Sequence, residues 1–142
     1  MNTVVLDTNT VVSAIFWPGS ISQRCLAGLA RRQYRIAVSG DVFAEYEAVA
    51  SELQIRFPAR NSRGALAWLR LKAGWVEPAP LGKPRSRDSK DDPFLACALP
   101  AQAKYLVTRD LDLLALGKPF GIQTITPARF LHWLRENHRP AL

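Results

Sequence analysis

An α/β fold, with a mostly parallel sheet covered by helices on both faces, is predicted by three features of the sequence. Short apolar runs alternate along the chain with longer segments whose apolar residues recur at helical spacing. The apolar runs are nearly continuous, which is typical of strands that are buried on both faces of a sheet. No internal repeat and no convincing domain boundary interrupts the 142 residues, so we expect one domain over residues 1–142.

The first part of the chain contains two predicted strands and two predicted helices. Residues 4–6 form an apolar run that predicts a buried strand, and a polar turn follows it. Apolar residues at helical spacing predict a helix over residues 21–32, and residues 34–38 form the second apolar run. Asp41 is expected to cap a helix that runs to about Leu53.

The middle of the chain contains a further helix, a strand and a long loop. Asn61 or Ser62 is expected to begin the helix, which ends near Gly74. Residues 75–76 predict a short strand. Residues 78–90 are rich in Pro, Gly and basic residues, so we expect a loop there.

The last part of the chain alternates between helices and strands in the same way. We expect helices over residues 93–102 and 111–116, and strands over residues 105–108 and 122–125. Thr126 is expected to cap a final helix with Pro127 in its first position, where the missing N–H would be unpaired in any case.

The composition is that of an ordinary globular domain. Apolar residues make up 48% and charged residues 22%, and no apolar run approaches the ~20 residues that a membrane-spanning helix needs. The N-terminus lacks the basic and apolar regions of a signal peptide. Cys25 and Cys97 have no CxxC or His pairing nearby, so we expect two buried thiols in a cytoplasmic protein that does not contact a membrane.

Acidic residues follow two of the predicted strands. Asp7 comes directly after the strand at residues 4–6, and Asp110 follows the strand at residues 105–108 by two residues. In open α/β sheets, function gathers at the carboxyl ends of the strands. If these two strands are neighbours, the carboxylates repel each other, and Mg²⁺ or Mn²⁺, which prefer oxygen ligands, would remove the repulsion.

Each of these acids also has a purely structural interpretation. Asp7 could be a turn or cap residue, with Asn9 and Thr10 satisfying the backbone of the turn. Asp110 could cap the helix that follows it. Asp112 is expected in the first turn of that helix, where its charge suits the helix dipole.

A third candidate stands at the start of the helix over residues 93–102. Asp92 directly precedes Pro93, which is typical of an N-cap followed by Pro in the first helical position. A helix that begins at the carboxyl edge of the sheet also points its first acid toward the same crevice, so both roles can coexist. Asp91 and Asp88 are alternatives to Asp92.

The fourth candidate, Glu45, flanks the apolar stripe of its helix. At ~100° per residue, its direction lies roughly 95° from the centre of the stripe. Glu47 and Glu52 lie at similar angles, so helical geometry leaves all three open, and an ordinary surface Glu is the alternative.

The balance of charge favours a polyanionic partner. The chain has 19 basic and 12 acidic residues, a net charge of +7. Setting aside Asp7, Glu45, Asp92 and Asp110 leaves eight acids against the 19 bases. A small acidic pocket in a basic surface is what a metal-dependent nuclease needs, because the acids hold cations that activate water and the bases hold phosphates.

Four segments of the chain resemble the PIN-domain family. Residues 4–14 (VVLDTNTVVSA) are similar to its opening strand and the segment after it, and residues 39–49 resemble the helix that carries its Glu. Residues 87–99 (RDSKDDPFLACAL) and 103–114 (AKYLVTRDLDLL) resemble its acid-rich central helix start and one of its strand ends. The segments occur in family order, and the most similar subgroup is that of the toxin components of type II toxin–antitoxin systems, relatives of VapC.

The resemblance implies a fold, an activity and a set of site residues. The fold would be a three-layer α/β/α Rossmann-like fold with a central, mostly parallel five-stranded sheet. The activity would be that of a Mg²⁺- or Mn²⁺-dependent ribonuclease whose products carry 5′-phosphate and 3′-hydroxyl ends. By position, the metal-binding and catalytic quartet would be Asp7, Glu45, Asp92 and Asp110, with Asn9, Thr108 and Asp91 as supporting residues.

Roles and partners follow from the same resemblance. Asp7 would be the central metal ligand, Asp92 and Asp110 would complete the shell, and Glu45 would hold a second ion or orient its water. RNA would be the substrate, and a cognate antitoxin or a second copy in a homodimer would dock on apolar helix faces. The residues of those faces are Phe43, Leu53, Leu66 and Leu69, for which packing inside the molecule is the alternative.

Two other functions compete with the nuclease interpretation. A phosphohydrolase of the haloacid dehalogenase type needs Asp-x-Asp-x-Thr after its first strand, but this chain has Asn9 and Val11 at the third and fifth positions. A non-catalytic module would keep its affinity for RNA or a protein partner when metal is chelated, and would cleave nothing. A nuclease would lose cleavage in chelator and in the Asp7→Asn variant.

Overall fold

Five parallel strands form one sheet in this computed structural model, which describes residues 1–86 and 89–138. The strands are β1 (Thr3–Leu6), β2 (Arg35–Val38), β3 (Gly74–Trp75), β4 (Tyr105–Val107) and β5 (Gln123–Ile125). Their spatial order is β3-β2-β1-β4-β5, and each neighbouring pair runs parallel. The predicted α/β class and five-stranded sheet are therefore confirmed.

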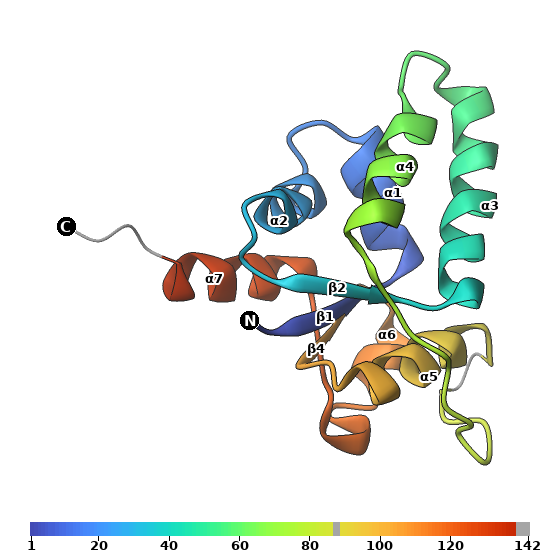
Figure 1. Ribbon diagram of the computed structural model, residues 1–142, viewed down its shortest axis with the longest axis vertical. Coiled ribbons are helices and arrows are strands. Elements are labelled where there is room, and N and C mark those ends of the chain that lie inside the picture. Colours follow the sequence, from blue (N-terminus) through green and yellow to red (C-terminus); the bar gives the residue numbers. More distant parts are fainter. Residues whose placement is uncertain (87–88, 139–142) are drawn as a thin grey trace.

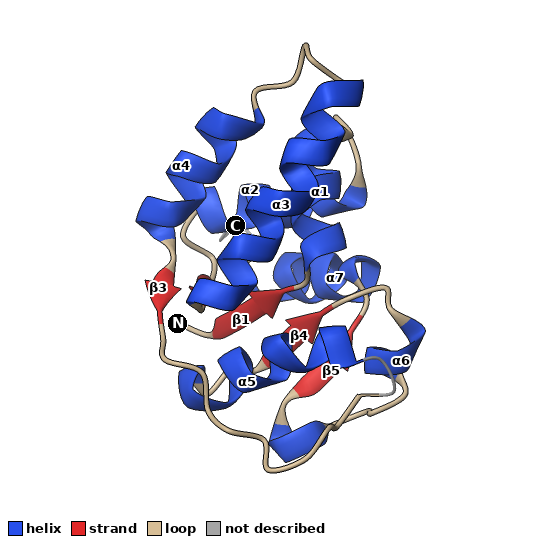
Figure 2. Ribbon diagram, turned by 90° about the vertical axis from the view of Figure 1, so that its right-hand side faces the viewer, coloured by secondary structure: helices blue, strands red, loops and turns tan. Residues whose placement is uncertain are grey.

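Helices cover both faces of this sheet, as Figures 1 and 2 show. On one side lie α1 (Thr8–Phe16), α2 (Ile21–Ala30), α3 (Gly40–Arg56), α4 (Ser62–Lys72) and α7 (Pro127–Asn137). On the other side lie α5 (Asp92–Ala101), which packs across β1, β2 and β4, and the short α6 (Leu111–Leu114) beside β5. Two 3-10 turns, Ser89–Asp91 and Pro119–Gly121, precede α5 and β5. The molecule therefore has the expected three-layer α/β/α architecture.

The core lies between these layers. Val4 in β1 and Leu106 in β4 are fully buried, as expected for the central strands of a sheet that is covered on both faces. On the α7 side, the ring of Phe130 packs edge-on against Tyr34 and Tyr105, with centroid distances of 5.0 and 6.0 Å. These rings hold α7 against the sheet.

The apolar faces of α3 and α4 contribute to the same core. Phe43, Leu66 and Leu69 are buried there, and Leu53 is partly buried against them. Of the two alternatives that the sequence left open for these four side chains, the structure shows packing inside the molecule.

Helix starts differ from the predicted ones at several places. α1 was not predicted, because its β-branched Val and Thr residues have low intrinsic helix propensity, and a cap from Asp7 and burial against the sheet override that preference. α3 is capped by Ser39, whose hydroxyl accepts a hydrogen bond from the Val42 N–H, and not by Asp41. Thr126 caps α7 and Asn61 caps α4, in agreement with the sequence.

The start of α5 also differs from its prediction. The helix begins at Asp92, so Asp91 occupies the N-cap position and Pro93 the second helical position. The prediction of Asp92 as N-cap was therefore wrong by one residue, and this shift changes which carboxylate faces the sheet edge. Asp88, the other alternative, lies outside the described residues.

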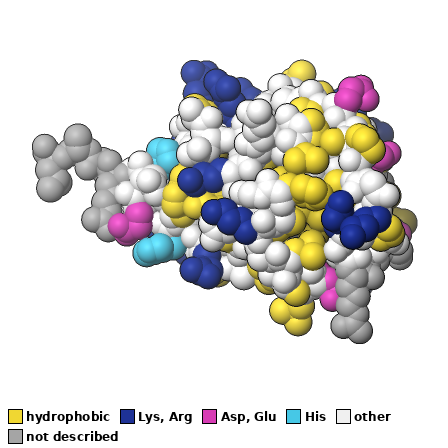
Figure 3. All heavy atoms as spheres, turned by 90° about the horizontal axis from the view of Figure 1, so that it is seen from below, with side chains coloured by type: hydrophobic (Ala, Val, Ile, Leu, Met, Phe, Trp, Pro, Cys, Tyr) yellow, Lys and Arg dark blue, Asp and Glu magenta, His cyan; other side chains and the backbone are white. Residues whose placement is uncertain are grey.

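Basic side chains are distributed over the surface of the molecule. On the face shown in Figure 3, Lys and Arg gather in several separate groups, while acidic side chains lie at the margins. Within residues 1–86 and 89–138, each helix is too short or too polar to cross a bilayer.

Candidate metal centre

The strand order reverses between β1 and β4, and this reversal creates a crevice at the carboxyl edge of the sheet. β1 connects to β2 on one side, whereas β4 pairs with β1 on its other side, with Leu6 opposite Val107. Connections that leave two neighbouring strands in opposite directions open a crevice between them, where ligands bind in folds of this type. Asp7 and Thr108 are the first residues beyond these two strands, so the fold places them at this point.

Asp7 is a buried carboxylate at the start of α1. It is only 5% exposed, and its Oδ1 accepts hydrogen bonds from the Thr10 N–H at 2.9 Å and the Thr10 hydroxyl at 2.6 Å. The carboxylate also lies at the positive end of the α1 dipole, which favours its negative charge. The predicted cap role of Asp7 is confirmed, and Thr10 is its cap partner.

Thr108 joins the two strand ends through one hydroxyl group. Its Oγ1 donates to Asp7 Oδ2 at 2.6 Å and accepts from the Asp110 N–H at 2.9 Å. The side chain is fully buried, so neither bond competes with solvent. Asp7 and Asp110 are therefore connected through a single oxygen, at adjacent positions on the sheet edge.

The electrostatics of Asp7 reflect this burial. Loss of solvent raises the pKa of Asp7 above its ordinary value of 3.8, hydrogen bonds from Thr10 and Thr108 lower it, and the negative charge of Asp110 raises it further. A nearby positive charge would favour the ionised form of this carboxyl group.

Two further carboxylates converge on Asp110. Asp91, Asp110 and Asp112 each offer one oxygen atom, and these oxygens lie within 4.8 Å of one another. All three side chains are half-buried. Asp110 is the N-cap of α6, where its Oδ1 accepts from the Asp112 N–H at 2.8 Å and the Leu113 N–H at 3.3 Å.

Asp92 points to a different set of partners. Its carboxylate accepts hydrogen bonds from the backbone N–H of Arg85, at 3.2 and 3.3 Å, and from that of Ser86 at 2.8 Å. The Ser86 hydroxyl in turn donates to Asp91 Oδ2 at 3.3 Å. Asp92 therefore holds the loop before α5, while its neighbour Asp91 belongs to the acidic group.

Glu45 lies on α3, one residue before a tyrosine that touches the end of β1. The Tyr46 hydroxyl donates to the Leu6 carbonyl, next to Asp7. Burial raises the pKa of Tyr46 well above its ordinary value, and the charges of Cys97, Asp7 and Glu45 raise it further. Asp7 and Glu45 are thus both within electrostatic range of one phenol. Asn9 lies on the exposed side of the first turn of α1.

With this geometry established, comparison with known families identifies the fold. The PIN domain matches residues 3–112, which cover most of the chain and all of the acids described above. The chain belongs to the PIN-domain family. Its members are generally metal-dependent nucleases. A comparison with curated proteins finds no match.

The residues at the carboxyl edge of this PIN domain fit a divalent cation. Mg²⁺ and Mn²⁺ take carboxylate oxygens as ligands, and the three oxygens of Asp91, Asp110 and Asp112 are already close enough to share one ion. Like charges at this separation repel, so a cation between them would stabilise the ionised group. The donor set contains only oxygen atoms, as these hard ions require.

Asp112 is the member of this acidic group that the sequence reasoning missed. Its position in the first turn of α6 was predicted correctly, but it was assigned only to the helix dipole. The spacing Asp110-x-Asp112 directly after a strand end was the available signal, since N-cap and second-position side chains both project from the start of a helix toward the crevice.

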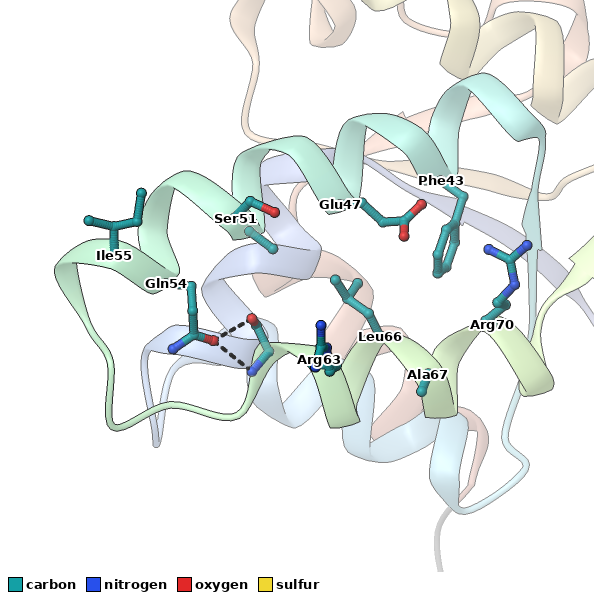
Figure 4. A pocket seen from close by; sticks show the side chains of 11 residues that line it. Phe43, Glu47, Ser51, Gln54, Ile55, Arg63, Leu66, Ala67 and Arg70 are labelled. Carbon is teal, nitrogen blue, oxygen red and sulfur yellow. Dashed lines mark hydrogen bonds between the residues drawn. The ribbon is translucent and has the colours of Figure 1, made fainter.

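A separate cavity of about 760 Å³ lies between α3 and α4, away from the acidic group (Figure 4). Glu47 projects into it from α3, and Arg63 and Arg70 line it from α4. Near its far end, Gln54 Oε1 accepts hydrogen bonds from the backbone and hydroxyl of Ser62, which joins the two helices. Of the three glutamates that helical geometry left open, Glu47 therefore faces this cavity.

Proposed function

We propose that this PIN domain is a Mg²⁺- or Mn²⁺-dependent endoribonuclease, and that it is the toxin of a toxin–antitoxin pair acting in the cytoplasm. The observation that supports the activity most directly is the convergence of Asp91, Asp110 and Asp112 beside Asp7 at the strand-order reversal. The basic remainder of the chain suits RNA as substrate.

Each acid has a proposed role. Asp7 and Asp110 are the central metal ligands, and Asp91 and Asp112 complete the set of oxygen donors. Asp92 is a positioning residue, because its carboxylate is engaged by two backbone N–H groups of the preceding loop. Glu45, which with Asp7 lies within electrostatic range of the Tyr46 phenol, binds a second ion or orients water.

The protein supplies a rigid and partly dehydrated setting for this chemistry. A bound divalent cation there would acidify water and stabilise the developing charge on the leaving oxygen of a phosphodiester. Thr10 and Thr108 fix the orientation of the Asp7 carboxylate, because the hydroxyl group of each donates a hydrogen bond of 2.6 Å to it. Thr108 also holds the Asp110 backbone, so that the two acids keep one relative position during turnover.

The toxin role adds two requirements to the nuclease. Expression of the chain should arrest growth of the host cell, and this arrest should depend on Asp7. A cognate antitoxin, encoded by a small open reading frame next to the gene, should relieve the arrest. A homodimer is a second proposed assembly, to be measured by light scattering of the purified chain.

The nuclease proposal is tested with the purified full-length chain and a labelled single-stranded RNA. Cleavage in Mg²⁺ or Mn²⁺ should stop in EDTA and resume when Mn²⁺ is added, with products that carry 5′-phosphates. Asp7→Asn should abolish cleavage and weaken Mn²⁺ binding measured by calorimetry. Asp41→Asn is the matched control, since Asp41 is an exposed acid in the first turn of α3.

Other outcomes would favour the competing functions. RNA that binds equally well with and without EDTA and is never cut indicates a non-catalytic binding module. A phosphorylated Asp7, trapped with a phosphomonoester substrate, indicates a phosphohydrolase of the haloacid dehalogenase type. Either result contradicts the nuclease proposal.

A further inference from the structure

A small pocket lies at the carboxyl edge of the sheet, where β2 and β3 end. It has a volume of about 450 Å³. The first turn of α3, which begins at Gly40, forms one wall, and residues 75–78, at the end of β3 and just after it, form the other. Trp75 and Glu77 line this cavity, and both residues are exposed. It is called the Trp75 pocket below.

The Trp75 pocket lies at the same level of the sheet as Asp7. Directly beyond the strands, the Asp7 N–H donates to the Val107 carbonyl, and the Val76 N–H donates to the Val38 carbonyl. The register of β1 with β2 and of β2 with β3 brings Asp7 and Val76 to one level, with only β2 between their strands. Two strand spacings amount to roughly 10 Å. A single-stranded RNA whose scissile phosphate lies at Asp7 therefore brings a nearby base to this pocket.

Buried rings connect the pocket with the end of β1. The Trp75 ring lies 5.3 Å from the ring of Phe43, which in turn lies 5.8 Å from that of Tyr46. The Tyr46 hydroxyl donates to the Leu6 carbonyl, next to Asp7. Phe43 and Tyr46 are both buried, so close packing sets the position of Trp75 relative to the metal centre.

Trp75 is anchored in the fold and still exposed. Its indole N–H donates to the Arg70 carbonyl at 3.2 Å, and the Arg70 guanidinium lies 5.0 Å from its ring. Figure 4 shows Arg70 and Phe43 together at one end of the cavity between α3 and α4. Despite these contacts, 45% of Trp75 is exposed. An anchored, exposed indole offers a flat surface on which an unpaired base can stack.

Glu77 adds a hydrogen-bond acceptor to the same pocket. A carboxylate accepts from the amino group of a base, as it does from N4 of cytosine, whereas uracil has no amino group. The negative charge of Glu77 also repels phosphate groups. A base therefore suits this pocket better than the RNA backbone does.

We propose that the Trp75 pocket binds an unpaired base of the RNA substrate, one that carries an exocyclic amino group. The base stacks on Trp75, and its amino group donates to Glu77. This inference rests on the proposed nuclease function and adds a base-selective subsite to it. The metal centre acts on a phosphodiester that all nucleotides share, so selection among sequences requires a contact with a base.

The test measures RNA binding by the full-length chain in EDTA, so that no cleavage contributes. Fluorescence anisotropy compares labelled oligo(C), oligo(U) and abasic strands of one length, since cytosine and uracil are similar in size and differ in the amino group. Trp75→Leu removes the stacking surface, and Trp75→Phe keeps a ring. Trp17→Leu is the matched control: Trp17 is also 45% exposed and lies 5.3 Å from a phenylalanine ring, but it follows the end of α1 that is remote from Asp7.

Trp75→Leu should lower the affinity for oligo(C) and for oligo(U) by about tenfold each, as expected for the loss of one base–aromatic stack. Trp75→Phe should retain most of the affinity, and Trp17→Leu should bind as the wild type does. The affinity for the abasic strand should be the same in all four proteins.

Glu77→Gln should remove the preference of the wild type for oligo(C) over oligo(U). The glutamine amide can donate to O4 of uracil as well as accept from an amino group, so it no longer distinguishes the two bases. Glu52→Gln, at an exposed position on α3, is the control and should keep the preference. Because Glu77 is exposed, this variant tests the pocket even if Trp75→Leu does not fold.

Several results would overturn the inference. Wild-type affinity in Trp75→Leu would show that this ring serves packing alone, and equal losses in Trp17→Leu or with the abasic strand would exclude stacking as the cause. An arginine-rich peptide that binds the wild type but not Glu77→Gln, with RNA binding unchanged, would assign the pocket to a basic protein. Metal-dependent cleavage is measured separately on the wild-type chain, so failure of the subsite and failure of the nuclease proposal are distinguishable.

Discussion

The two halves of the acidic site are built in different ways. The strand half consists of Asp7, Thr108, Asp110 and Asp112, which follow β1 and β4, and one buried hydroxyl links Asp7 to the backbone of Asp110. The loop half consists of Ser86, Asp91 and Asp92, which lie at the end of a long loop and the start of α5. The sheet therefore fixes one part of the centre, whereas the start of α5 decides whether Asp91 or Asp92 completes it.

The largest expected effect is the difference in activity between the Asp110→Asn and Asp92→Asn variants. Asp110→Asn removes a proposed metal ligand and should lower kcat/KM for RNA by at least about 100-fold, since each tenfold loss corresponds to about 1.4 kcal/mol of transition-state stabilisation. Asp92→Asn keeps an oxygen that can accept from the Ser86 N–H, so we expect less than about a tenfold loss. Cleavage rates at saturating Mg²⁺ measure both.

Equal losses of kcat/KM in Asp110→Asn and Asp92→Asn would contradict this division of the site into two halves. They would place Asp92 among the metal ligands. The Asp91→Asn variant is then informative, because an activity close to that of the wild type would exclude Asp91 from the centre, whereas a large loss would keep both acids.

A smaller effect is expected from the bridging hydroxyl of the strand half. Thr108→Val preserves the shape of the side chain but leaves Asp7 Oδ2 and the Asp110 N–H without their shared partner. Leaving buried polar groups unpaired costs about 1–3 kcal/mol of unfolding free energy, which denaturant titration can measure. Mn²⁺ affinity should also fall, since the two acids lose their common anchor.

Thr124→Val provides the control for this change. Thr124 is also buried, on β5, and its hydroxyl makes a single bond to the Gly117 carbonyl at 3.0 Å. We expect a cost of about 1 kcal/mol and unchanged Mn²⁺ affinity. A Thr108 variant that behaves like this control would show that the bridge does not position the acids.

The smallest expected effect is the pH dependence of stability in the metal-free protein. Burial raises the pKa of Asp7 in the folded state above the ordinary value of 3.8, so the folded state binds this proton more tightly than the unfolded state does. The stabilisation is therefore complete below pH 3.8 and is lost as pH rises through the folded-state pKa. Asp7→Asn removes this penalty, and should raise the melting temperature in EDTA at pH 7 by roughly 4 °C for each kcal/mol of penalty.

This gain should shrink as the pH falls toward 4, because the protonated fraction of Asp7 in the folded wild type then increases. Melting curves between pH 4 and 8, with EDTA throughout, measure the trend. A variant that melts below the wild type at every pH would show that the Asp7 hydrogen bonds outweigh the cost of its burial. Added Mn²⁺ should reverse the order, because only the wild type keeps the full metal site.

The sequence predicted the strand half well, for a physical reason. Asp7 and Asp110 follow continuous apolar runs, and strands buried on both faces leave a clear signal at the point where they end. The sequence placed these two acids, about 100 residues apart, at one edge only on the condition that their strands are neighbours, and the observed pairing of β1 with β4 meets that condition. Ligation of metal by these acids stays a prediction.

The sequence could not predict which acid of the loop half joins the acidic group. Neighbouring residues at a helix start point in directions about 100° apart, so a shift of one residue in the start of α5 exchanges the roles of Asp91 and Asp92. Here a 3-10 turn over Ser89–Asp91 leads directly into α5, and the Asp91 side chain makes no capping hydrogen bond that would mark the boundary. α1 was missed for a related reason, since tertiary burial outweighed the low helix propensity of its β-branched residues.

The hydrogen bond between Thr108 and Asp7 spans 101 positions of the chain, and this separation has a consequence for biosynthesis. During translation, Asp7 leaves the ribosome long before its partner is made, and the edge of β1 that later receives β4 stays vacant until then. A nascent chain that ends before residue 105 therefore lacks Asp110 and Asp112, two of the four proposed ligands, and the strand that aligns them with Asp7. Under the proposed ribonuclease function, a chain assembled in this order would be unable to cut its own messenger until nearly four-fifths of the sequence had been translated.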